Sequence, residues 1–486
     1  MNNNNINNIN NSTINKSTQE IEKIMKIFDD KIVWENLRPM PAEKQKSYEE
    51  LPKILNEKER KYLLDRLVVV KLNGGLGTTM GCKGPKSLVE LSNGLNFLEF
   101  TLRQHEILNE EIKKEGKEEN KKEIPFLLMN SFCTDIQTKE YLAKRDKSTS
   151  YVECFCQSKC PRIYADTLEL VPKQWDDCPD EGWYPPGHGN IFPVMADCGL
   201  LDRLLAEGRD IAFFANIDNT GAIFDERIAK VMADGIADYI LEVTPRTPAD
   251  GGTLVEIDDG YRLTQLECPH VPEEHQDDFP IKEKLGNLKL AMLANEKRLS
   301  NGRPILQLEQ SIGDVIRNFP GRALAINVSR KRFLPVKSTK DLFHLRSKSL
   351  FSFDSSFCLL RKIREGNLPE IILSNEEFGI LANFEKRIPK IPKINSNVQK
   401  IVINGNVFIG NGVEFQGKLI EIIAEKGKCV YIPDNSIIKK EELIEEQKNG
   451  FINKQQNGEE NKNFKIDING NDNKFLERCQ IWLFRE

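Results

Sequence analysis

Several features that would assign the chain to a special class of protein are missing from its sequence. The longest apolar runs, such as residues 124–129, are far shorter than the roughly 20 residues that span a bilayer, so we expect no membrane helix. The start is rich in asparagine and has neither the basic nor the apolar region of a secretory signal, so we expect a cytosolic protein. The formal net charge is only -5 with both signs interspersed, which gives no reason to expect a nucleic acid as partner.

The sequence also lacks the spacing of a structural metal site. Its eleven cysteines are scattered from Cys82 to Cys479, and an odd number cannot fully pair, which is typical of free thiols in a reducing compartment. The cluster of Cys154, Cys156 and Cys160, followed by Cys178, does not contain the paired C-x2-C motifs of zinc knuckles. Zinc is therefore the minor interpretation of this cluster.

What the sequence does contain divides the chain into five stretches. At 486 residues it is too long for one compact core, so a large domain with appended pieces is expected. The stretches are an asparagine-rich disordered tail (1–21), a helical N-terminal segment (22–65), the main domain (66–385), a C-terminal β-solenoid-like or stacked-hairpin module (386–438), and a helix with a mostly disordered tail (439–486).

Apolar, strand-like runs alternate with helix-spaced segments in the main domain. Five such runs lie at 68–72, 126–129, 211–215, 239–243 and 323–328. This alternation predicts a Rossmann-like α/β fold with a mixed, mainly parallel nucleotide-binding sheet flanked by helices. Ligands of such sheets lie at the carboxyl ends of the strands, so the loops after these runs form the candidate site.

The most informative stretch is VVVKLNGGLGTTMGCKGPKSLVEL, from Val68 to Leu91. A β-branched strand precedes closely spaced glycines, which let the backbone approach a ligand, and Lys86 adds a mobile charge for phosphate. Two familiar motifs do not fit. A Walker A loop would place glycine, not Pro85, before Lys86, and Met80 occupies the third glycine position of the Rossmann fingerprint. Taken alone, the loop could also be a tight packing turn.

Two polar residues in other loops have a chemical reason to be functional. Asp218 comes just after the run IAFFAN and could bind Mg²⁺ between phosphates as a hard oxygen ligand, or it could be a turn or N-cap aspartate. His188 lies between two glycines in YPPGHGNIF, a loop that we expect to have little capacity to bury it. It could donate a hydrogen bond to a phosphate, or it could be an exposed loop histidine.

These motifs together resemble a known family. LNGGLGTTMG followed by GPKS is similar to the signature loop of the eukaryotic UTP:glucose-1-phosphate uridylyltransferases, and FCQSKCPRI, YPPGHGNIF, FFANIDNTGAIFD and RKRFLPVK match in the same order. The resemblance implies that residues 66–385 are a catalytic nucleotidyltransferase domain. It implies a reversible, Mg²⁺-dependent reaction in which glucose 1-phosphate attacks the α-phosphorus of UTP in line, giving UDP-glucose and pyrophosphate. It also leaves open a homo-oligomer formed through the C-terminal β module.

The resemblance further implies which residues form the site. The residues that would bind UTP are Leu72, Asn73, Gly74, Gly75, Lys86, Gln157, Gly187, Asp218 and Lys337. Those that would bind the sugar phosphate are Gly74, Gly75, His188, Asn216, Ile217, Asp218, Gly252, Glu267 and Asn287. Asp218 would be the metal ligand, and Lys337 would be the catalytic residue that bridges the attacking and leaving phosphates. Gln157 and Gly187 would complete the uracil pocket, because reading uracil requires buried and fully paired amide groups.

The sequence departs from the family pattern mainly around the sugar. Where the family has FNTNN, the chain has KLGNL at 284–288, and Asn287 alone remains of those asparagines. The lysine that usually precedes Gly251 and Gly252 is also absent. Two alternatives therefore stay open: a pyrophosphorylase for a different sugar 1-phosphate, and a catalytically weak paralogue that binds nucleotide or assembles with an active partner.

Overall fold

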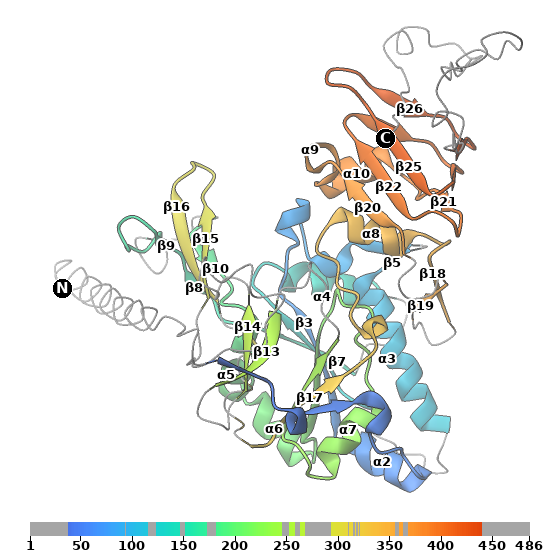
Figure 1. The fold of residues 1–486 in the computed structure, drawn as a ribbon. Helices are drawn as coiled ribbons and strands as arrows, with labels where there is room; N and C mark the ends of the chain where they lie inside the picture. Colours follow the sequence, from blue (N-terminus) through green and yellow to red (C-terminus); the bar gives the residue numbers. More distant parts are fainter. Residues whose placement is uncertain are drawn as a thin grey trace, which may run out of the picture. The chain divides into compact units, whose positions relative to one another are not determined.

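The chain forms two compact units, each assembled from separate stretches (Figure 1). Unit 1 comprises Met1–Gly75, Leu108–Asn216 and Ala222–Phe333, and unit 2 comprises Leu76–Ile107, Ile217–Gly221 and Leu334–Glu486. The predicted boundaries, which cut the chain into consecutive stretches, stay predictions. The computed structural model describes residues 37–92, 94–114, 123–145, 151–172, 181–244, 252–257, 263–267, 293–309, 311–313, 316, 319, 321–354, 359–362 and 368–439.

A four-stranded parallel sheet with the order β11-β3-β6-β7 lies in unit 1. Its strands are β3 (Leu67–Asn73), β6 (Phe126–Asn130), β7 (Val152–Cys156) and β11 (Ile211–Asn216). Every residue of β3 and β6 is buried, as expected for inner strands of a parallel sheet with both faces covered. The predicted α/β class with a mainly parallel sheet is therefore confirmed.

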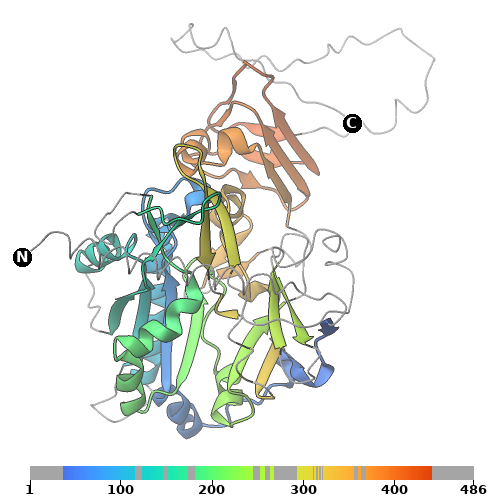
Figure 2. The same ribbon diagram turned by 90° about the vertical axis from the view of Figure 1, so that its left-hand side faces the viewer.

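Helices cover this sheet, and a second parallel sheet with the order β12-β17-β2 extends unit 1. The added elements are α5 (Ile191–Asp197), α6 (Leu200–Ala206), α7 (Glu226–Ala233), α2 (Glu57–Asp65), β2 (Gln45–Ser47), β12 (Tyr239–Val243) and β17 (Ala323–Asn327). Apolar side chains of α5 and α6 pack against Val68 and Val70 of β3. Figure 2 shows the green helices of this part of the chain beside the strands of the first sheet. Val231 of α7 packs with Leu324 and Ile326 of the second sheet.

Three smaller antiparallel sheets make unit 1 a mixed structure, with the orders β1-β13-β14, β15-β16-β9 and β10-β8. Their strands are β1 (Leu37–Pro39), β8 (Cys160–Pro161), β9 (Ile163–Tyr164), β10 (Trp183–Tyr184), β13 (Gly252–Ile257), β14 (Leu263–Glu267), β15 (Leu293–Arg298) and β16 (Pro304–Glu309). The helix α4 (Asp135–Ala143) follows β6 in the chain.

Unit 2 contains the glycine-rich loop from Leu76 onward and the described residues from 334 to 439. Its elements before the β module are β4 (Glu90–Ser92), β5 (Leu95–Asn96), the first part of α3 (Phe97–Lys114), α8 (Thr339–Arg346), β18 (Phe351–Phe353) and β19 (Leu359–Arg361). The short helices α9 (Asn375–Phe378) and α10 (Leu381–Arg387) lie between the first two strands of the module in the chain. One apolar core joins the loop residue Met80 to Phe343 of α8 and to the β module. The loop is thereby fixed to this unit.

The C-terminal β module is a stack of short parallel strands. They are β20 (Glu370–Leu373), β21 (Lys393–Ile394), β22 (Lys400–Asn404), β23 (Val407–Ile409), β24 (Glu414–Gln416), β25 (Leu419–Ile423), β26 (Val430–Ile432) and β27 (Ile437–Lys439). The paired strands are parallel and lie two or three strands apart in the chain, as in a solenoid and unlike stacked hairpins. The predicted β-helix-like module is confirmed.

The segment predicted to be helical over 22–65 is α-helical only near its end in the described part. It contains β1, the 3-10 helices Ala42–Lys44 and Tyr48–Glu50, and β2 before α2 begins. Pro39, Pro41 and Pro52 explain the difference, because proline lacks an amide hydrogen and disfavours the α conformation in the residue before it. The helix and tail predicted for 439–486 lie outside the described residues from residue 440 onward.

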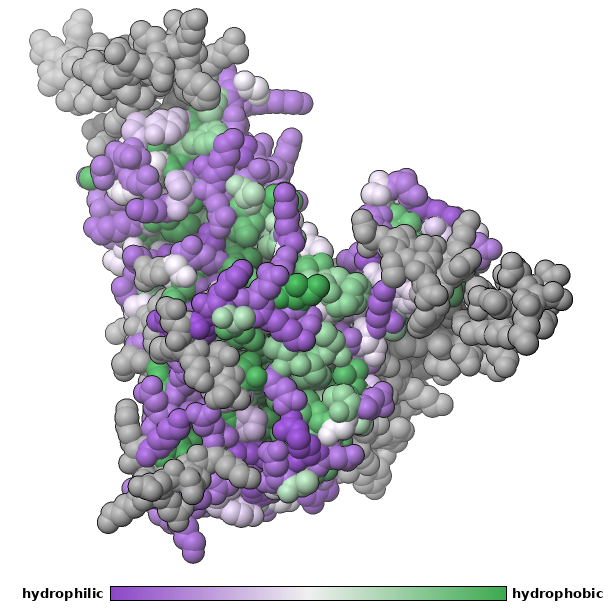
Figure 3. All heavy atoms as spheres, turned by 180° about the vertical axis from the view of Figure 1, so that it is seen from behind, coloured by the Kyte–Doolittle hydropathy of each residue, from purple (hydrophilic) through white to green (hydrophobic). Residues whose placement is uncertain are grey.

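None of the described helices is both long and apolar enough to cross a membrane. Hydrophilic and apolar residues are interspersed on the face shown in Figure 3.

The seven cysteines of the described part, including Cys154, Cys156 and Cys160, are free thiols. Within that part there is no group of three or more His, Cys, Asp or Glu that could hold a metal ion.

Candidate active site

The carboxyl ends of β3 and β6 are joined by a buried network of amide and hydroxyl groups. The Nδ2 of Asn73 donates to Asn130 Oδ1 at 2.7 Å and to Thr138 Oγ1 at 3.0 Å. The hydroxyl of Thr134 donates to the carbonyl oxygen of Asn73 at 2.8 Å. Buried polar groups need such partners because water cannot reach them. The network therefore fixes the backbone where the glycine-rich loop begins, directly after Leu72 and Asn73.

Gly74 is the first residue of this loop, and Gln157 fills the space next to it. A Cβ atom at position 74 would lie 2.0 Å from Gln157 Nε2, so no other residue fits unless that side chain moves. The Gln157 side chain is buried, and its Oε1 has no hydrogen-bond partner among the described residues. An unpaired buried oxygen is costly, so a ligand N–H at this position would be favourable. A Cβ at Gly75, by contrast, would meet no atom within 4 Å.

Gly187 and His188 lie in the loop before α5. Gly187 has a φ of 90°, which favours glycine, and it precedes the 3-10 helix His188–Asn190. The Nδ1 of His188 accepts a hydrogen bond from the Ile312 N–H at 2.9 Å, which places the ring proton on Nε2. Burial lowers the pKa of His188, so the neutral ring presents Nε2–H as a donor. The side chain of His188 is half-buried, with the N–H of Ile312 against its ring, although the loop was expected to have little capacity to bury it.

Asn216 is the last residue of β11 and pairs with Leu72 of the neighbouring strand β3. Its side chain is exposed, whereas that of the next residue, Ile217, is buried. Gln157 directly follows β7, which ends at the same edge of the sheet. Unit 1 therefore brings Leu72, Asn73, Gln157 and Asn216 to one edge, where ligands of parallel sheets are found.

In unit 2, Lys86 and Asp218 form an ion pair through Nζ and Oδ2. Both side chains are mostly buried, with 15% and 17% of their surface exposed. Lys86 directly follows Pro85 and packs against Gly77, whose φ of 64° again favours glycine. The glycine-rich loop thus places a lysine on the aspartate that follows β11 in the chain.

Lys337 precedes α8, and the start of this helix fixes its backbone. The main-chain N–H of Lys337 donates to Asp341 Oδ2 at 2.9 Å, and Ser338 forms a capping box with Asp341. The carbonyl oxygen of Lys337 accepts a hydrogen bond from the Thr79 hydroxyl at 3.2 Å. The backbone is therefore attached to the glycine-rich loop while the residue itself is exposed and can reach a ligand.

A further hydrogen bond in unit 2 joins the Asp218 segment to the Lys337 segment. The N–H of Leu334 donates to Asn219 Oδ1 at 2.8 Å. Together with the ion pair and the Thr79 hydrogen bond, it connects the three segments that carry Lys86, Asp218 and Lys337. These are three of the four predicted residues with charged side chains, the fourth being Glu267.

Asp218 is suited to a magnesium ion that is shared with a substrate. Mg²⁺ is commonly bound through one or two carboxylates together with substrate phosphates, and it does not need a cage made entirely by the protein. One carboxylate at the end of a strand, next to a lysine that can also pair with phosphate, fits that pattern. The same site without a phosphate ligand would offer too few oxygen donors.

The predicted sugar-binding residues are only partly described. Gly252 at the start of β13 and Glu267 at the end of β14 are Cα partners across an antiparallel pair. Asn287 and the altered stretch 284–288 lie outside the described residues. Their predicted contact with the sugar stays a prediction.

Sequence reasoning missed two buried cations, Lys71 and Arg332. Lys71 lies in the middle of the buried strand β3, and burial lowers its pKa to about 7. Arg332 lies five residues before Lys337, with 14% of its side chain exposed. The sequence did mark Lys71, since a lysine within the apolar run VVVKLN indicates a buried charge. No comparable signal marked Arg332, since it lies among other basic residues in RKRF.

Comparison with protein families and curated proteins gives a consistent result. A family model described as UTP–glucose-1-phosphate uridylyltransferase matches residues 17–286 and 280–416. The chain is 39% identical over 402 residues to the UTP–glucose-1-phosphate uridylyltransferase of Saccharomyces cerevisiae, covering 77% of each chain. It is 37% identical over 436 residues to that of Solanum tuberosum, covering 85% of this chain and 88% of the other.

Solved structures agree with this match. The UDP-glucose phosphorylase of Trypanosoma brucei has a TM-score of 0.72 and 29% identity, covering 87% of this chain and 98% of that one. A variant of the Leishmania major UDP-glucose pyrophosphorylase, solved in complex with UDP-glucose, has a TM-score of 0.73 and 27% identity. That likeness covers 89% of this chain and 97% of the other.

Proposed function

The chain belongs to the UTP–glucose-1-phosphate uridylyltransferase family, and we infer that it forms UDP-glucose and pyrophosphate from UTP and glucose 1-phosphate in a reversible reaction. The resemblance of the glycine-rich loop predicted this family, and the matches along most of the chain confirm it. The chain is an enzyme of the nucleotidyltransferase class.

The reaction must bring two polyanions together. An oxygen of the sugar phosphate attacks the α-phosphorus of UTP, and pyrophosphate leaves in line with the new bond. Because both substrates are anionic, most of the rate enhancement comes from positioning and from positive charge near the phosphates. The observation that carries the proposal is the connection in unit 2 of the segments bearing Lys86, Asp218 and Lys337.

Lys337 is the proposed catalytic residue. Its exposed ammonium group would contact the attacking and leaving phosphates, where negative charge builds up in the transition state. Lys86 would leave its ion pair with Asp218 to bind the UTP phosphates. Asp218 would hold Mg²⁺, which when bound supplies charge neutralisation to the phosphate oxygens.

The proposed uracil pocket consists of Gln157, Gly187 and the backbone of 72–75. Uracil offers an N–H donor flanked by carbonyl acceptors, and an amide side chain can pair with both kinds of group. The unpaired Oε1 of Gln157 and the close approach of its Nε2 to Gly74 support this role. A pocket of this kind rejects bases whose groups would leave buried amides unpaired.

The sugar phosphate would be bound by residues of both the strand edge and the loops. His188 would donate through Nε2–H, and its bond to Ile312 supports that role by fixing the tautomer. The other proposed contacts are Gly74, Gly75, Asn216, Ile217, Asp218, Gly252, Glu267 and Asn287. The substrate assignment to glucose 1-phosphate agrees with the UDP-glucose complex of the Leishmania major relative.

The test is the release of pyrophosphate from UTP by the purified protein with Mg²⁺. We expect the highest kcat/KM with glucose 1-phosphate, compared with galactose 1-phosphate and N-acetylglucosamine 1-phosphate. A preference for either of the other sugars would change the assigned substrate, because stretch 284–288 differs from the family pattern. Absence of UTP-dependent turnover with all three would overturn the proposed activity.

Self-association through the C-terminal β module is a further proposal. Tyr431 and Ile437 of the module are large apolar residues with 42% and 55% of their surface exposed. Mass measurement in solution with and without a charged substitution at Ile437 tests it.

The free cysteines of the described part favour a reducing compartment, in agreement with the predicted cytosolic location.

A further inference from the structure

Two buried cations bind consecutive carbonyl oxygens in the segment that follows Asp218. The Nζ of Lys71 donates to the carbonyl oxygen of Ala222 at 2.7 Å. The Nη2 of Arg332 donates to the carbonyl oxygen of Ile223 at 2.7 Å. Lys71 comes from β3, and Arg332 comes from the segment that leads to Lys337. Residues 222–223, which follow Asp218 in the chain, are therefore held by two different parts of unit 1.

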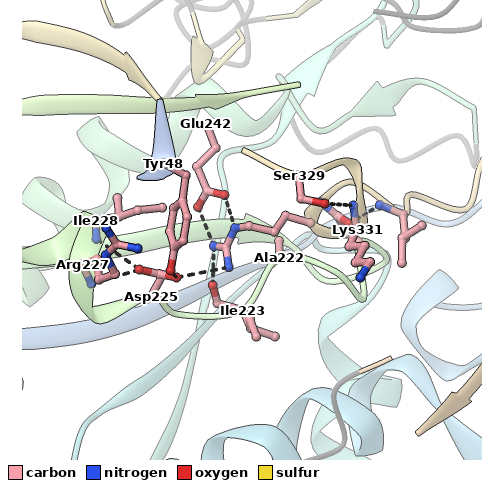
Figure 4. A network of polar contacts seen from close by, with 12 residues as sticks. Tyr48, Ala222, Ile223, Asp225, Arg227, Ile228, Glu242, Ser329 and Lys331 are labelled. Atoms are coloured by element: carbon pink, nitrogen blue, oxygen red, sulfur yellow. Dashed lines mark hydrogen bonds and ion pairs between the residues drawn. The ribbon is translucent and has the colours of Figure 1, made fainter. Parts of the chain in front are cut away.

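The guanidinium of Arg332 is held in a fixed orientation. Its Nε and Nη2 pair with the two carboxylate oxygens of Glu242 in β12, and its Nη1 lies 3.9 Å from Asp225 Oδ2. Figure 4 shows Glu242, Ile223 and Asp225 facing the same guanidinium. A forked pair of this kind fixes direction as well as distance, which a lysine cannot do.

Asp225 is fixed in turn by its own neighbours. Its Oδ1 caps α7 by accepting from the N–H groups of Arg227 and Ile228, and its Oδ2 accepts from the Tyr48 hydroxyl at 2.7 Å (Figure 4). Arg227 also stacks over the Tyr48 ring, with its guanidinium carbon 4.6 Å from the ring centre. The surroundings of Arg332 are thus a rigid frame.

The segments of Asp218 and Lys337 are joined by one hydrogen bond in each unit. In unit 1, Arg332 donates to the carbonyl oxygen of Ile223, and in unit 2 the N–H of Leu334 donates to Asn219 Oδ1. Asp218 directly precedes Asn219 in the chain, and Lys337 follows Leu334 by three residues. The second bond is therefore adjacent in sequence to both groups.

Stability alone does not account for this arrangement. Burying an ion pair costs desolvation, and apolar residues of similar size often replace such pairs without loss of stability. A fixed orientation, in contrast, matters for transfer reactions, because displacements of about 1 Å far from the chemistry can lower rates by about a hundredfold. The forked pairing of Arg332 provides that orientation.

We propose that Arg332 is a positioning residue for the transfer reaction: through Ile223 and Glu242 it keeps the segment of Asp218 in register with the segment of Lys337. The inference rests on the proposed function, since it concerns the alignment of the metal ligand with the catalytic lysine. It adds Arg332, and with it Asn219, to the residues on which turnover depends.

The experiment compares Arg332→Lys, Arg332→Met and Asn219→Ala with the wild type. We expect kcat to fall about tenfold in Arg332→Lys and further in Arg332→Met, while KM for both substrates stays within about twofold. Asn219→Ala removes the acceptor of the Leu334 N–H and should lower kcat in the same way. Because both residues act on one alignment, the double variant Arg332→Lys with Asn219→Ala should lose less than the product of the single losses.

Arg322 provides a matched control. It pairs in the same forked manner with Asp238, but at the amino ends of β17 and β12 and with 53% of its side chain exposed. Arg322→Lys and Arg322→Met should leave kcat unchanged. Equal losses in the Arg322 and Arg332 variants would mean that any arginine pair on these strands matters, and would overturn the proposal.

The remaining outcomes separate the inference from the function on which it rests. A wild-type protein without turnover would defeat the proposed function itself. An active wild type together with an Arg332→Met variant of equal kcat would defeat the positioning role alone, as would a kcat loss that matches the fraction unfolded at the assay temperature. If the Arg332 variants do not fold, Asn219→Ala decides: an unchanged kcat counts against the proposal, and a selective kcat loss supports it.

Discussion

The carboxyl edge of the central sheet and the C-terminal β module bury opposite kinds of side chain. Around the ends of β3 and β6 the buried residues include Asn73, Asn130, Thr134 and Gln157. In the described part of the module, residues 370–439, no polar or charged side chain is buried. Burial of apolar area stabilises a fold, whereas burial of a polar group is costly unless it is paired. The first region is therefore arranged for binding and the second for stability.

The largest effect should come from removing the proposed catalytic lysine. Lys337→Ala should lower kcat about a thousandfold, as losses of preorganised charge contacts in active sites do, while the midpoint of thermal unfolding stays unchanged because the residue is exposed. Steady-state kinetics and a thermal melt check both parts. Lys340→Ala, an exposed lysine in the first turn of α8, is the matched control and should keep full turnover. Wild-type kcat in Lys337→Ala would remove this residue from the mechanism.

The converse effect is expected in the β module. Ile401 of β22 is completely buried, so Ile401→Ala should lower the free energy of unfolding by about 3 kcal/mol through lost apolar contacts and a cavity. Its kcat and KM, measured well below the melting temperature, should stay at wild-type values. Ile372→Ala at an exposed position of the same module should change stability by less than about 0.5 kcal/mol. A loss of kcat in folded Ile401→Ala protein would show that the module also supports the site.

The same contrast explains how far the sequence could predict the structure. Strands such as 68–72 and the solenoid strands were identifiable because apolar periodicity reflects burial, and burial decides where strands lie. The position of Asn73 and Asn216 at one edge followed from their place after such strands, whereas Gln157, which follows a strand that was not predicted, was assigned to the site only by the family resemblance. In the described part of the segment 22–65, residues before α2 form short strands and 3-10 helices instead of the expected helix, because three prolines outweigh the helix-like spacing of Leu51, Ile54 and Leu55.

Contacts between distant residues could not be predicted. The local sequence around His188 predicts only a loop. The partner of its ring, the Ile312 N–H, is 124 positions away in the chain, so no local pattern could reveal it. Arg332 looked like one of several surface basic residues, and its partners Ile223 and Glu242 are 109 and 90 positions away. Single-sequence patterns report local periodicity, so they reveal a buried strand but not the side chain that pairs with a distant carbonyl.

A smaller effect, confined to nucleotide binding, is expected from Gly74→Ala. The new Cβ would lie 2.0 Å from Gln157 Nε2, and the end of that flexible side chain can move away at little cost to the fold. We expect KM for UTP to rise about tenfold with stability and kcat nearly unchanged, because a displaced amide no longer pairs with uracil. Gln157→Ala should produce a similar rise, and the double variant should be no worse than either single variant. Additive losses would show that Gly74 acts independently of Gln157.

The smallest effect concerns Lys71, a buried residue of β3 whose charge changes near neutral pH. Its pKa is lowered to about 7, against 10.5 for an ordinary lysine, mainly by burial and also by the neighbouring Arg332, while Glu242 opposes the shift. Between these two values the unfolded chain keeps the proton that the folded chain lacks. Unfolding then takes up a proton, so the free energy of unfolding must increase with pH across this window.

Lys71→Met removes this pH dependence of the free energy of unfolding. It tests whether the central sheet differs from the β module by a buried lysine charge as well as by buried amide groups. Well below pH 7 the lysine is protonated in both states, so the difference in unfolding free energy between wild type and variant should be nearly constant there. From pH 7 to pH 8 the wild type should gain about 1 kcal/mol relative to the variant. Denaturant titrations at pH 6, 7 and 8 measure this difference. A difference that stays constant over all three would mean that Lys71 keeps its proton, and the strand edge would then contain a permanent buried charge.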